Sequence, residues 1–247
     1  MRKSKYLVMS SFYFKFDKNL SKIIEINELF KKQNILDLFR FDKIKIIIEN
    51  EFFENENINF IYLPVSIEKI GGYAFHSCKI QILDLSNCIK LKNIEDSAFS
   101  YNQIKQLKLP QTIENINEFA FSENQIQILD LSNCIKLKII KPLAFMNNQI
   151  KQLRLTKNIK IIDAYAFESN KIKILDLSNC VKLKKIKWCA FSINPLKEIK
   201  ILGNIEIEYD NYYKKDMWNE FAIYYNDNNK KEGYYKLEND EWKWYPL

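Results

Sequence analysis

Apolar residues along the chain occur in pairs that flank one polar residue, and the pairs recur at a nearly constant interval. The clearest copies belong to the segment Leu-Asp-Leu-Ser-Asn-Cys, which appears at Leu83, Leu129 and Leu175. The second apolar residue of each pair falls at positions 16, 38, 63, 85, 109, 131, 155, 177 and 201. Since side chains alternate between the two faces of a strand, each pair predicts a short strand with one buried face.

The interval between the pairs predicts a solenoid. From position 63 onwards the steps alternate between 22 and 24 residues, and a period of about 20–50 residues is typical of repeat arrays. We therefore predict parallel β-strands stacked at alternating 22- and 24-residue units and joined by short helical or irregular turns. The row of strands is expected to extend from Phe14 and Phe16 to Ile199 and Ile201.

Three further columns of residues follow the strands in constant phase. The first column is Ile70, Ile94, Ile116, Ile140, Ile162 and Ile186. The second is an Ala-Phe dipeptide with its ring at Phe75, Phe99, Phe121, Phe145, Phe167 and Phe191. The third is Cys78, Asn102, Asn124, Asn148, Asn170 and Asn194. We expect the Phe rings to stack in the core and the Asn side chains to bond unpaired backbone groups of the turns.

Together these columns resemble the bacterial leucine-rich repeats of the BspA-like surface-antigen type. The resemblance covers residues 50–202 well and residues 12–50 loosely. The aromatic segment from Phe221 to Trp244 is similar to the closing segment of some proteins in that family. The resemblance implies a leucine-rich repeat solenoid that binds other macromolecules, often outside the cell.

The ends of the chain differ from its middle, and we expect three regions. Residues 1–50 are interpreted as degenerate N-terminal repeats or a cap, residues 51–202 as regular leucine-rich repeats, and residues 203–247 as an aromatic C-terminal cap. In the first region, Leu20–Phe30 has helical spacing but aligns with Thr112–Phe121, so we interpret it as a repeat. In the last, alternating apolar residues over 234–238 and 241–245 predict a β-hairpin, because a solenoid must cover its last coil.

The outward side chains of the strands are the candidate partner-binding surface. Except at Tyr62, acidic and basic residues alternate at the position between the two buried residues of each pair, so each Asp is expected to lie between two cations. Two residues earlier, Ile82, Ile128 and Ile174 are either covered by neighbouring Gln and Lys side chains or form an exposed apolar stripe. The candidate residues are Tyr62, Ile82, Asp84, Lys108, Ile128, Asp130, Arg154, Ile174 and Asp176.

Residue types that carry catalysis or bind metals are scarce. His76 is the single histidine and is expected to be a solvated turn residue. Cys88, Cys134 and Cys180 lie two coils apart, about 9.6 Å at the strand spacing, whereas bridged cysteines need Cα atoms within about 7 Å. We interpret these three as buried thiols. We expect no enzymatic activity, no cofactor and no metal.

Charge and hydropathy bear on the partner and the compartment. The net charge is +7, but the basic residues are scattered through the repeats, so a nucleic-acid partner is not expected. No apolar run approaches the roughly 20 residues of a membrane span. Without a recognisable signal peptide the sequence favours the cytoplasm, whereas the resemblance implies the cell surface or secretion.

Two functions remain open at this level. The first is a non-enzymatic binding protein, for protein–protein interaction or adhesion, which uses the sheet face or the aromatic C-terminal end. Its partner would be a protein, such as a host or cell-surface macromolecule. The alternative is an intracellular structural or scaffold repeat protein. No oligomeric state is predicted.

Overall fold

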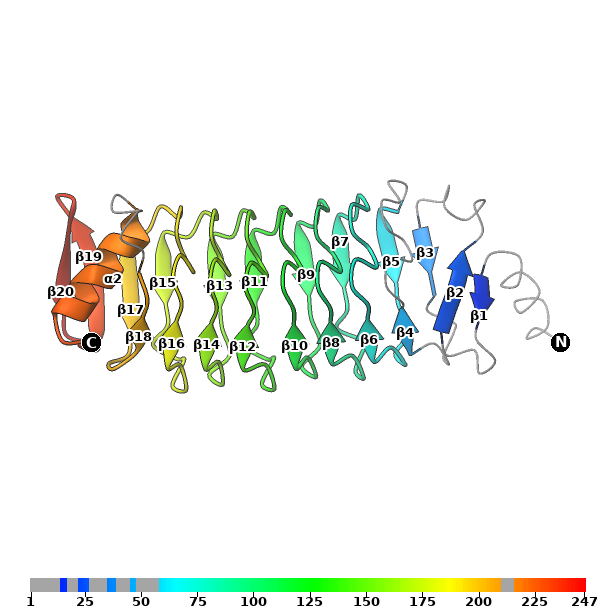
Figure 1. Cartoon of the computed structure of the whole chain (residues 1–247), viewed down its shortest axis with the longest axis horizontal. Coiled ribbons are helices and arrows are strands. Elements are labelled where there is room, and N and C mark those ends of the chain that lie inside the picture. The colour runs from blue at the N-terminus through cyan, green and yellow to red at the C-terminus, as the bar shows by residue number, and fades with distance from the viewer. Residues whose placement is uncertain (1–13, 17–21, 27–34, 39–44, 48–57, 210–215) are drawn as a thin grey trace.

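The protein is an elongated solenoid. The computed structural model describes residues 14–16, 22–26, 35–38, 45–47, 58–209 and 216–247. Each coil runs along one sheet, turns, returns along a second sheet and turns again, and the coils follow one another along the long axis (Figure 1). The predicted solenoid of stacked parallel strands is confirmed. The limits of the three predicted regions remain a prediction.

The first sheet, named here the leucine sheet, is formed by the strands that carry the paired apolar residues. In nearly every three-residue strand the first and third side chains are exposed and the middle side chain is buried. The strands are β3 (Ile35–Asp37), β5 (Phe60–Tyr62), β7 (Ile82–Asp84), β9 (Gln106–Lys108), β11 (Ile128–Asp130), β13 (Gln152–Arg154), β15 (Ile174–Asp176) and β17 (Glu198–Ile201).

The isoleucine column forms a sheet of its own, named here the isoleucine sheet. In the described part of the chain it has ten strands, which pair in one continuous sheet. The strands are β1 (Phe14–Phe16), β2 (Lys22–Ile26), β4 (Ile46–Ile47), β6 (Lys69–Ile70), β8 (Asn93–Ile94), β10 (Asn115–Ile116), β12 (Ile139–Ile140), β14 (Ile161–Ile162), β16 (Lys185–Ile186) and β18 (Glu206–Ile207). Each coil therefore carries two short strands.

The prediction that Phe14 and Phe16 begin the leucine row is wrong. Strand β1 pairs antiparallel with β2, with Phe14 opposite Ile26, and so belongs to the isoleucine sheet. The physical reason is that two apolar residues around a polar one suit a half-buried strand on either sheet. The segment with helical spacing contains the strand Lys22–Ile26, in keeping with its interpretation as a repeat.

The 22- and 24-residue units make different contacts in the leucine sheet. Across the 24-residue units the strands pair over three residues, as in β7 with β9, β11 with β13 and β15 with β17. Across the 22-residue units, β5–β7 and β9–β11 share a single residue pair each, and β13 and β15 belong to separate sheets. The structural unit of this sheet is therefore two coils, which matches the 46-residue step between Leu83, Leu129 and Leu175.

The phenylalanine column forms the predicted stack in a dry core. All six rings are fully buried. Successive ring centroids lie 5.2, 5.5, 5.4, 5.6 and 5.3 Å apart, and neighbouring planes are inclined by no more than 11°. Because each ring contacts the one before and the one after, the stack links every coil from Phe75 to Phe191.

The asparagine column bonds the backbone on both sides, as predicted. The Oδ1 atom of Asn102 accepts the backbone N–H of Ile80 at 3.0 Å. Its Nδ2 atom donates to the carbonyl of Phe75 in the preceding coil at 2.7 Å and to that of Phe99 in its own coil at 3.1 Å. The same set recurs at Asn124, Asn148, Asn170 and Asn194.

Two edges join the sheets (Figure 1). The asparagine edge, at the top of that view, comprises the turns with the Phe and Asn columns. Its residues are 71–79, 95–103, 117–125, 141–149, 163–171 and 187–195. The connecting edge, at the bottom, comprises the loops that lead from each leucine-sheet strand to the next isoleucine-sheet strand. Its residues are 64–68, 86–92, 110–114, 132–138, 156–160 and 178–184.

The turns of the asparagine edge hold left-handed backbone at residues that are not glycine. In each turn the residue before Ala-Phe and the second residue after it have φ between 51° and 59°. This conformation costs about 1–2 kcal/mol for an L-residue. It lets alternate N–H groups reach the next coil, as at Ser97, Phe99 and Tyr101, whose N–H groups donate over 2.8, 2.9 and 3.1 Å. The bonds between coils offset the strain.

The C-terminal cap contains a helix that the sequence reading missed. Helix α2 (Met217–Asp227) covers the open end of the core, where Trp218 lies 5.0 Å from the ring of Phe191. The carboxylate of Asp216 caps this helix and also accepts the N–H of Ile193 at 2.8 Å, in place of a carbonyl from a further coil. The residue that caps the N terminus of the helix therefore accepts a backbone N–H group that the last turn of the stack would otherwise leave unpaired.

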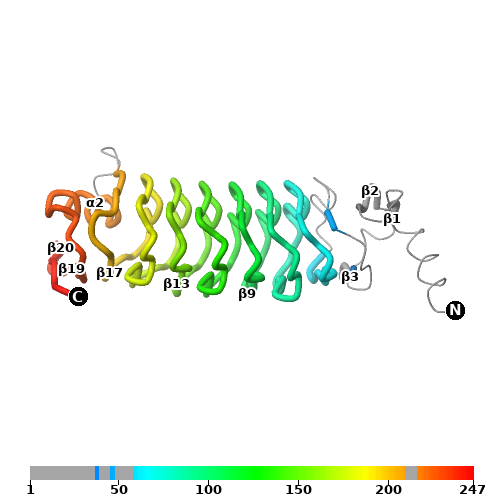
Figure 2. Tube along the Cα trace, turned by 90° about the horizontal axis from the view of Figure 1, so that it is seen from below, coloured from blue at the N-terminus to red at the C-terminus, as the bar shows by residue number. Residues whose placement is uncertain are grey.

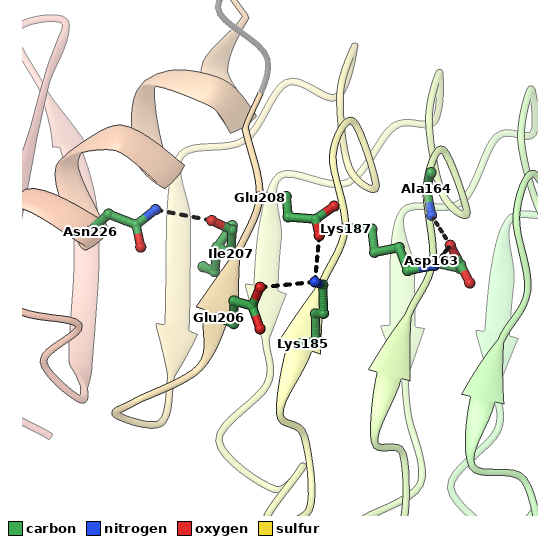
Figure 3. Close-up of polar contacts among 8 residues, drawn as sticks. All are labelled: Asp163, Ala164, Lys185, Lys187, Glu206, Ile207, Glu208 and Asn226. Atoms are coloured by element: carbon green, nitrogen blue, oxygen red, sulfur yellow. Dashed lines mark hydrogen bonds and ion pairs between the residues drawn. The ribbon is translucent and has the colours of Figure 1, made fainter.

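The edges of both sheets are also covered at this end. Strands β19 (Gly233–Glu238) and β20 (Glu241–Tyr245) form the expected hairpin, and β19 pairs antiparallel with β17. A Cβ atom at position 233 would lie 2.1 Å from Nε1 of Trp244, so this position requires glycine. On the isoleucine sheet, Nδ2 of Asn226 donates to the carbonyl of Ile207 at 3.0 Å (Figure 3).

Charged residues hold the last coils of the isoleucine sheet in register. Lys185 on β16 bonds Glu206 on β18 and also Glu208, and Lys187 bonds Asp163 at 2.8 Å (Figure 3). The bonds to Glu206 and Glu208 hold the pKa of Lys185 above its ordinary value. Each pair joins neighbouring coils, so its contribution is to alignment of the stack.

Candidate binding surface

The outer face of the leucine sheet exposes the apolar residues that the sequence left in question. Ile82, Ile128 and Ile174 are 43, 58 and 55% exposed. The interpretation that neighbouring Gln and Lys side chains cover them is wrong. Side chains on a sheet stand roughly perpendicular to it, so Gln106 and Gln152 lie beside the isoleucines on neighbouring strands and leave their tips open.

One part of this face is a contiguous apolar patch. Phe60 on β5 pairs in register with Ile82 on β7, and Tyr62 lies two residues further along β5. Phe60 and Tyr62 are 36 and 53% exposed. Phe60 was not among the predicted candidates, although its place in the same row as Ile82 was visible in the sequence. Ile128 and Ile174, by contrast, are each separated from the next apolar residue by a strand that carries Gln.

The charged candidates form pairs along the same face. Nζ of Lys108 lies 3.0 Å from Oδ2 of Asp84, and Nη1 of Arg154 lies 3.6 Å from Oδ2 of Asp130. Both pairs fall inside the two-coil unit, where the strands are fully paired. Asp176 and Lys200 lie in register, but Lys200 is not ion-paired among the described residues; its Nζ lies 6.0 Å from the centroid of the Tyr234 ring.

The prediction that each Asp lies between two cations is wrong. The Oδ1 atom of Asp84 accepts the N–H and the hydroxyl of Ser86, at 3.0 and 2.5 Å, and the corresponding serines do the same for Asp130 and Asp176. One carboxylate oxygen therefore holds the turn that follows the strand. The other oxygen is left for a single cation.

Asp84 and Asp130 are fixed negative charges on this face. Partial burial acts to raise the pKa of Asp84, but the hydrogen bonds from Ser86 and the contact with Lys108 outweigh it and hold the pKa below its ordinary value. The pKa of Asp130 is lowered in the same way by Ser132 and Arg154. At neutral pH the face therefore presents a fixed alternation of charge between exposed apolar side chains.

His76 links two coils on the asparagine edge. Its Nδ1 lies 2.6 Å from Oγ of Ser100, and its ring lies between those of Tyr73 and Tyr101, at 5.6 and 5.3 Å. It is a turn residue, as expected, but its side chain is half-buried and not fully solvated. Ser100 and Tyr101 belong to the next coil, so their contacts with His76 could not be predicted from the residues next to it in the sequence.

All five cysteines are buried. Burial, with the charge of the nearby aspartates added, raises the pKa of Cys88, Cys134 and Cys180 to about 11. These thiols are protonated at neutral pH and are therefore weak nucleophiles. Within the described ranges, no cluster of three or more His, Cys, Asp or Glu residues is placed to hold a metal ion. No helix in the described part of the chain is long and apolar enough to cross a bilayer.

Coils of 22 and 24 residues with a buried leucine pair, a stacked Phe column and an Asn column define a leucine-rich repeat solenoid. The chain belongs to the BspA type of leucine-rich repeat. The family description "BspA type Leucine rich repeat region" matches it with six copies, over residues 22–147 and 130–235. No curated protein matches the sequence.

Two solved structures resemble this one at low sequence identity. A leucine-rich repeat protein from Bacteroides ovatus is 15% identical with a TM-score of 0.46; the match covers 81% of this chain and 66% of that protein, slightly under two thirds of its length. A leucine-rich cell surface protein from Faecalibacterium prausnitzii is 13% identical with a TM-score of 0.28, over 83% of this chain and 94% of that protein.

Proposed function

We propose that this protein is a non-enzymatic binding module, for protein–protein interaction or adhesion, that binds a partner protein through the outer face of the leucine sheet. The observation that carries the proposal is the exposed patch of Phe60, Tyr62 and Ile82. Aromatic and aliphatic side chains at the centre of an interface supply most of its binding energy, because their burial removes apolar surface from water.

The charges around this patch support a protein partner. The pairs Asp84–Lys108 and Asp130–Arg154 alternate in sign along the sheet. A patterned surface of this kind selects one orientation of a partner and disfavours others. The backbone that carries it is paired into a continuous stack, so the face is already ordered before binding and little conformational entropy is lost.

The experiment has two stages. A photo-crosslinking side chain is placed at Ile128 on the leucine sheet, and at Asn115 on the isoleucine sheet as the control; both positions are exposed. The intact chain is then irradiated in extracts of its own cells and of host tissue. We expect a discrete crosslinked protein from position 128 and none from position 115.

The second stage measures affinity for the captured protein. The double variant Tyr62→Ser/Ile82→Asn is expected to weaken binding by at least about tenfold, since two exposed apolar anchors are lost. The matched control Asn93→Ser/Asn115→Ser alters the other sheet and is expected to bind as the parent chain does. Equal crosslinking from both positions, or unchanged affinity of Tyr62→Ser/Ile82→Asn, would contradict the proposal. Self-assembly of the purified chain without a partner would favour the scaffold alternative.

A further inference from the structure

The connecting edge gathers the lysines that the sequence shows as scattered. Its six loops, all of them described, hold two acidic residues, Glu68 and Glu114. The same loops hold eight lysines: Lys90, Lys92, Lys136, Lys138, Lys157, Lys160, Lys182 and Lys184. Because most of these recur at 46-residue steps, the winding of the coils brings them into a row. Figure 2 looks onto this edge. Lysines that look scattered along the sequence are therefore aligned along one edge of the solenoid.

The turns of the asparagine edge contain acidic and basic residues in more equal numbers. Its turns carry six acidic residues, namely Glu95, Asp96, Glu118, Glu123, Asp163 and Glu168. They carry four lysines, namely Lys79, Lys141, Lys171 and Lys187. Four further lysines, Lys105, Lys151, Lys173 and Lys197, lie between these turns and the leucine-sheet strands. The connecting edge, with eight lysines against two acidic residues, therefore has the larger excess of positive charge, which gives it a positive potential.

Most of the positive charge on the connecting edge is unneutralised. Glu68 pairs with Lys45 at 3.3 Å, and Glu114 lies 3.7 and 3.6 Å from Lys92 and Lys136. The remaining six lysines have no carboxylate within ion-pair distance among the described residues. They are Lys90, Lys138, Lys157, Lys160, Lys182 and Lys184, and all are exposed.

Aliphatic side chains project from the same edge. Ile89, Ile135 and Val181 are 61, 54 and 65% exposed, and Val65 is 44% exposed. The first three each follow a buried cysteine and precede an exposed lysine. They lie two coils apart, about 9.6 Å at the strand spacing. The row therefore alternates apolar tips with cationic groups.

The backbone fixes the direction of these tips. The N–H groups of Cys88, Ile89 and Leu91 donate to carbonyls within the same loop, over 2.9, 2.9 and 2.8 Å. Cys88 and Leu91 are buried on either side of Ile89, so the loop is anchored at both ends and Ile89 points outward. The loops at Ile135 and Val181 have the same bonds.

We propose that the connecting edge binds peripherally to the surface of an anionic lipid bilayer. Lysines near such a surface contribute about 1 kcal/mol each through the headgroup charge. Aliphatic tips that enter the boundary between headgroups and acyl chains add the burial of apolar area. The lysines of this edge therefore suit the charged headgroups, and its aliphatic side chains suit the apolar layer beneath them.

Two other partners fit the edge less well. A hydrated polyanion such as a nucleic acid would engage the lysines but would offer no apolar phase to the aliphatic tips. The six loops also contain no aromatic residue on which bases could stack. A protein partner suits a patterned surface, whereas this edge repeats the same lysine and aliphatic chemistry, which suits a laterally uniform surface. With this edge on a membrane, the leucine sheet stands upright and remains open to a partner.

The test is sedimentation of the full chain with vesicles. We expect binding to vesicles of about one part phosphatidylglycerol to two parts phosphatidylcholine, none to pure phosphatidylcholine, and a decrease with added salt. Lys90→Gln/Lys136→Gln/Lys182→Gln should lower the partition coefficient by about 100-fold. Ile89→Asn/Ile135→Asn/Val181→Asn, which keeps every charge, should lower it by at least about tenfold.

The matched control removes the same charge from the other edge. Lys79→Gln/Lys141→Gln/Lys171→Gln is expected to bind vesicles within about twofold of the parent chain. All substituted side chains on the connecting edge are exposed, and circular dichroism melting checks that each variant folds. Failure of the parent chain to bind anionic vesicles would overturn the proposal. So would full binding by the triple Asn variant, which together with binding to duplex DNA would identify the edge as a polyanion site.

Discussion

The two edges of the solenoid join the same pair of sheets, yet they are built on opposite principles. On the asparagine edge the backbone of one coil bonds that of the next, the Phe and Asn side chains are buried, and non-glycine residues accept left-handed φ angles. On the connecting edge the loops bond mainly within themselves and send Lys, Ile and Val side chains into solvent.

This difference separates what the fold requires from what it leaves free. A buried turn between coils must satisfy every N–H and C=O group, so its residues are determined by hydrogen bonding and volume. An exposed loop with internal bonds tolerates many side chains. The repeated Lys and aliphatic residues of the connecting edge are exposed and lie outside the buried core, which is why we attribute them to binding.

The largest expected effect comes from the core beside the asparagine edge. Phe145→Ala should lower the free energy of unfolding by about 3–5 kcal/mol, because its ring stacks on Phe121 and Phe167, 5.4 and 5.6 Å away. Denaturant titration measures the loss. The control Asp130→Asn weakens an exposed ion pair and should cost less than about 1 kcal/mol. Similar losses for both variants would mean that the buried and exposed faces are wrongly assigned.

A smaller effect is expected from the asparagine column. Asn148→Ala should cost about 1–3 kcal/mol, since it leaves the buried N–H of Ile126 without its side-chain partner. It also removes one of the two side-chain hydrogen bonds that the buried carbonyl of Phe121 accepts, the other coming from Asn124. The matched control is Asn133→Ala on the connecting edge, where the side chain is exposed and the change should stay within about 0.5 kcal/mol. Thermal melts that shift equally for the two variants would remove the distinction between the edges.

The smallest effect has the opposite sign. Ile193 is a β-branched residue at φ 55° with 60% of its surface exposed. Ile193→Gly should raise the free energy of unfolding by about 1 kcal/mol, because glycine adopts this conformation without strain. Ile135→Gly on the connecting edge, which is not in the left-handed region, should give no gain. Stabilisation by both substitutions, or by neither, would show that backbone strain does not distinguish the two edges.

Columns of identical residues were the most reliable guide to the fold. A Phe or Asn that recurs in constant phase must occupy the same place in every coil, so the ring stack and the backbone bonds of Asn102 follow from the spacing alone. The sheet to which Phe14–Phe16 belongs did not follow, because a half-buried strand suits either sheet. Helix α2 had a signal, since Trp218, Phe221, Ala222 and Tyr225 are spaced for one helical face behind the cap Asp216, but the many aromatic residues hid it.

The candidate surface was predictable in part. The alternation along a strand places Ile82 and Asp84 on the outer face, but whether Gln106 covers Ile82 depends on side-chain direction across strands. The hydrogen bond from Ser86 to one carboxylate oxygen of Asp84 was not predicted either, because Ser86 lies in the turn beyond the strand. The row of lysines could not be predicted without the path of the coils. Residues 46 positions apart align along one edge only after two coils of unequal length.

The two-coil unit of the leucine sheet sets a rule for how this array can change its length. Removing the single coil between Leu85 and Leu109 would bring like charges onto adjacent strands and join loops of the wrong size. Removing the 46 residues between Leu85 and Leu131 would leave each acid beside a base and each long loop beside a short one. Viable lengths of this protein therefore differ by an even number of coils, and the preparation of a shortened or lengthened array should respect that parity.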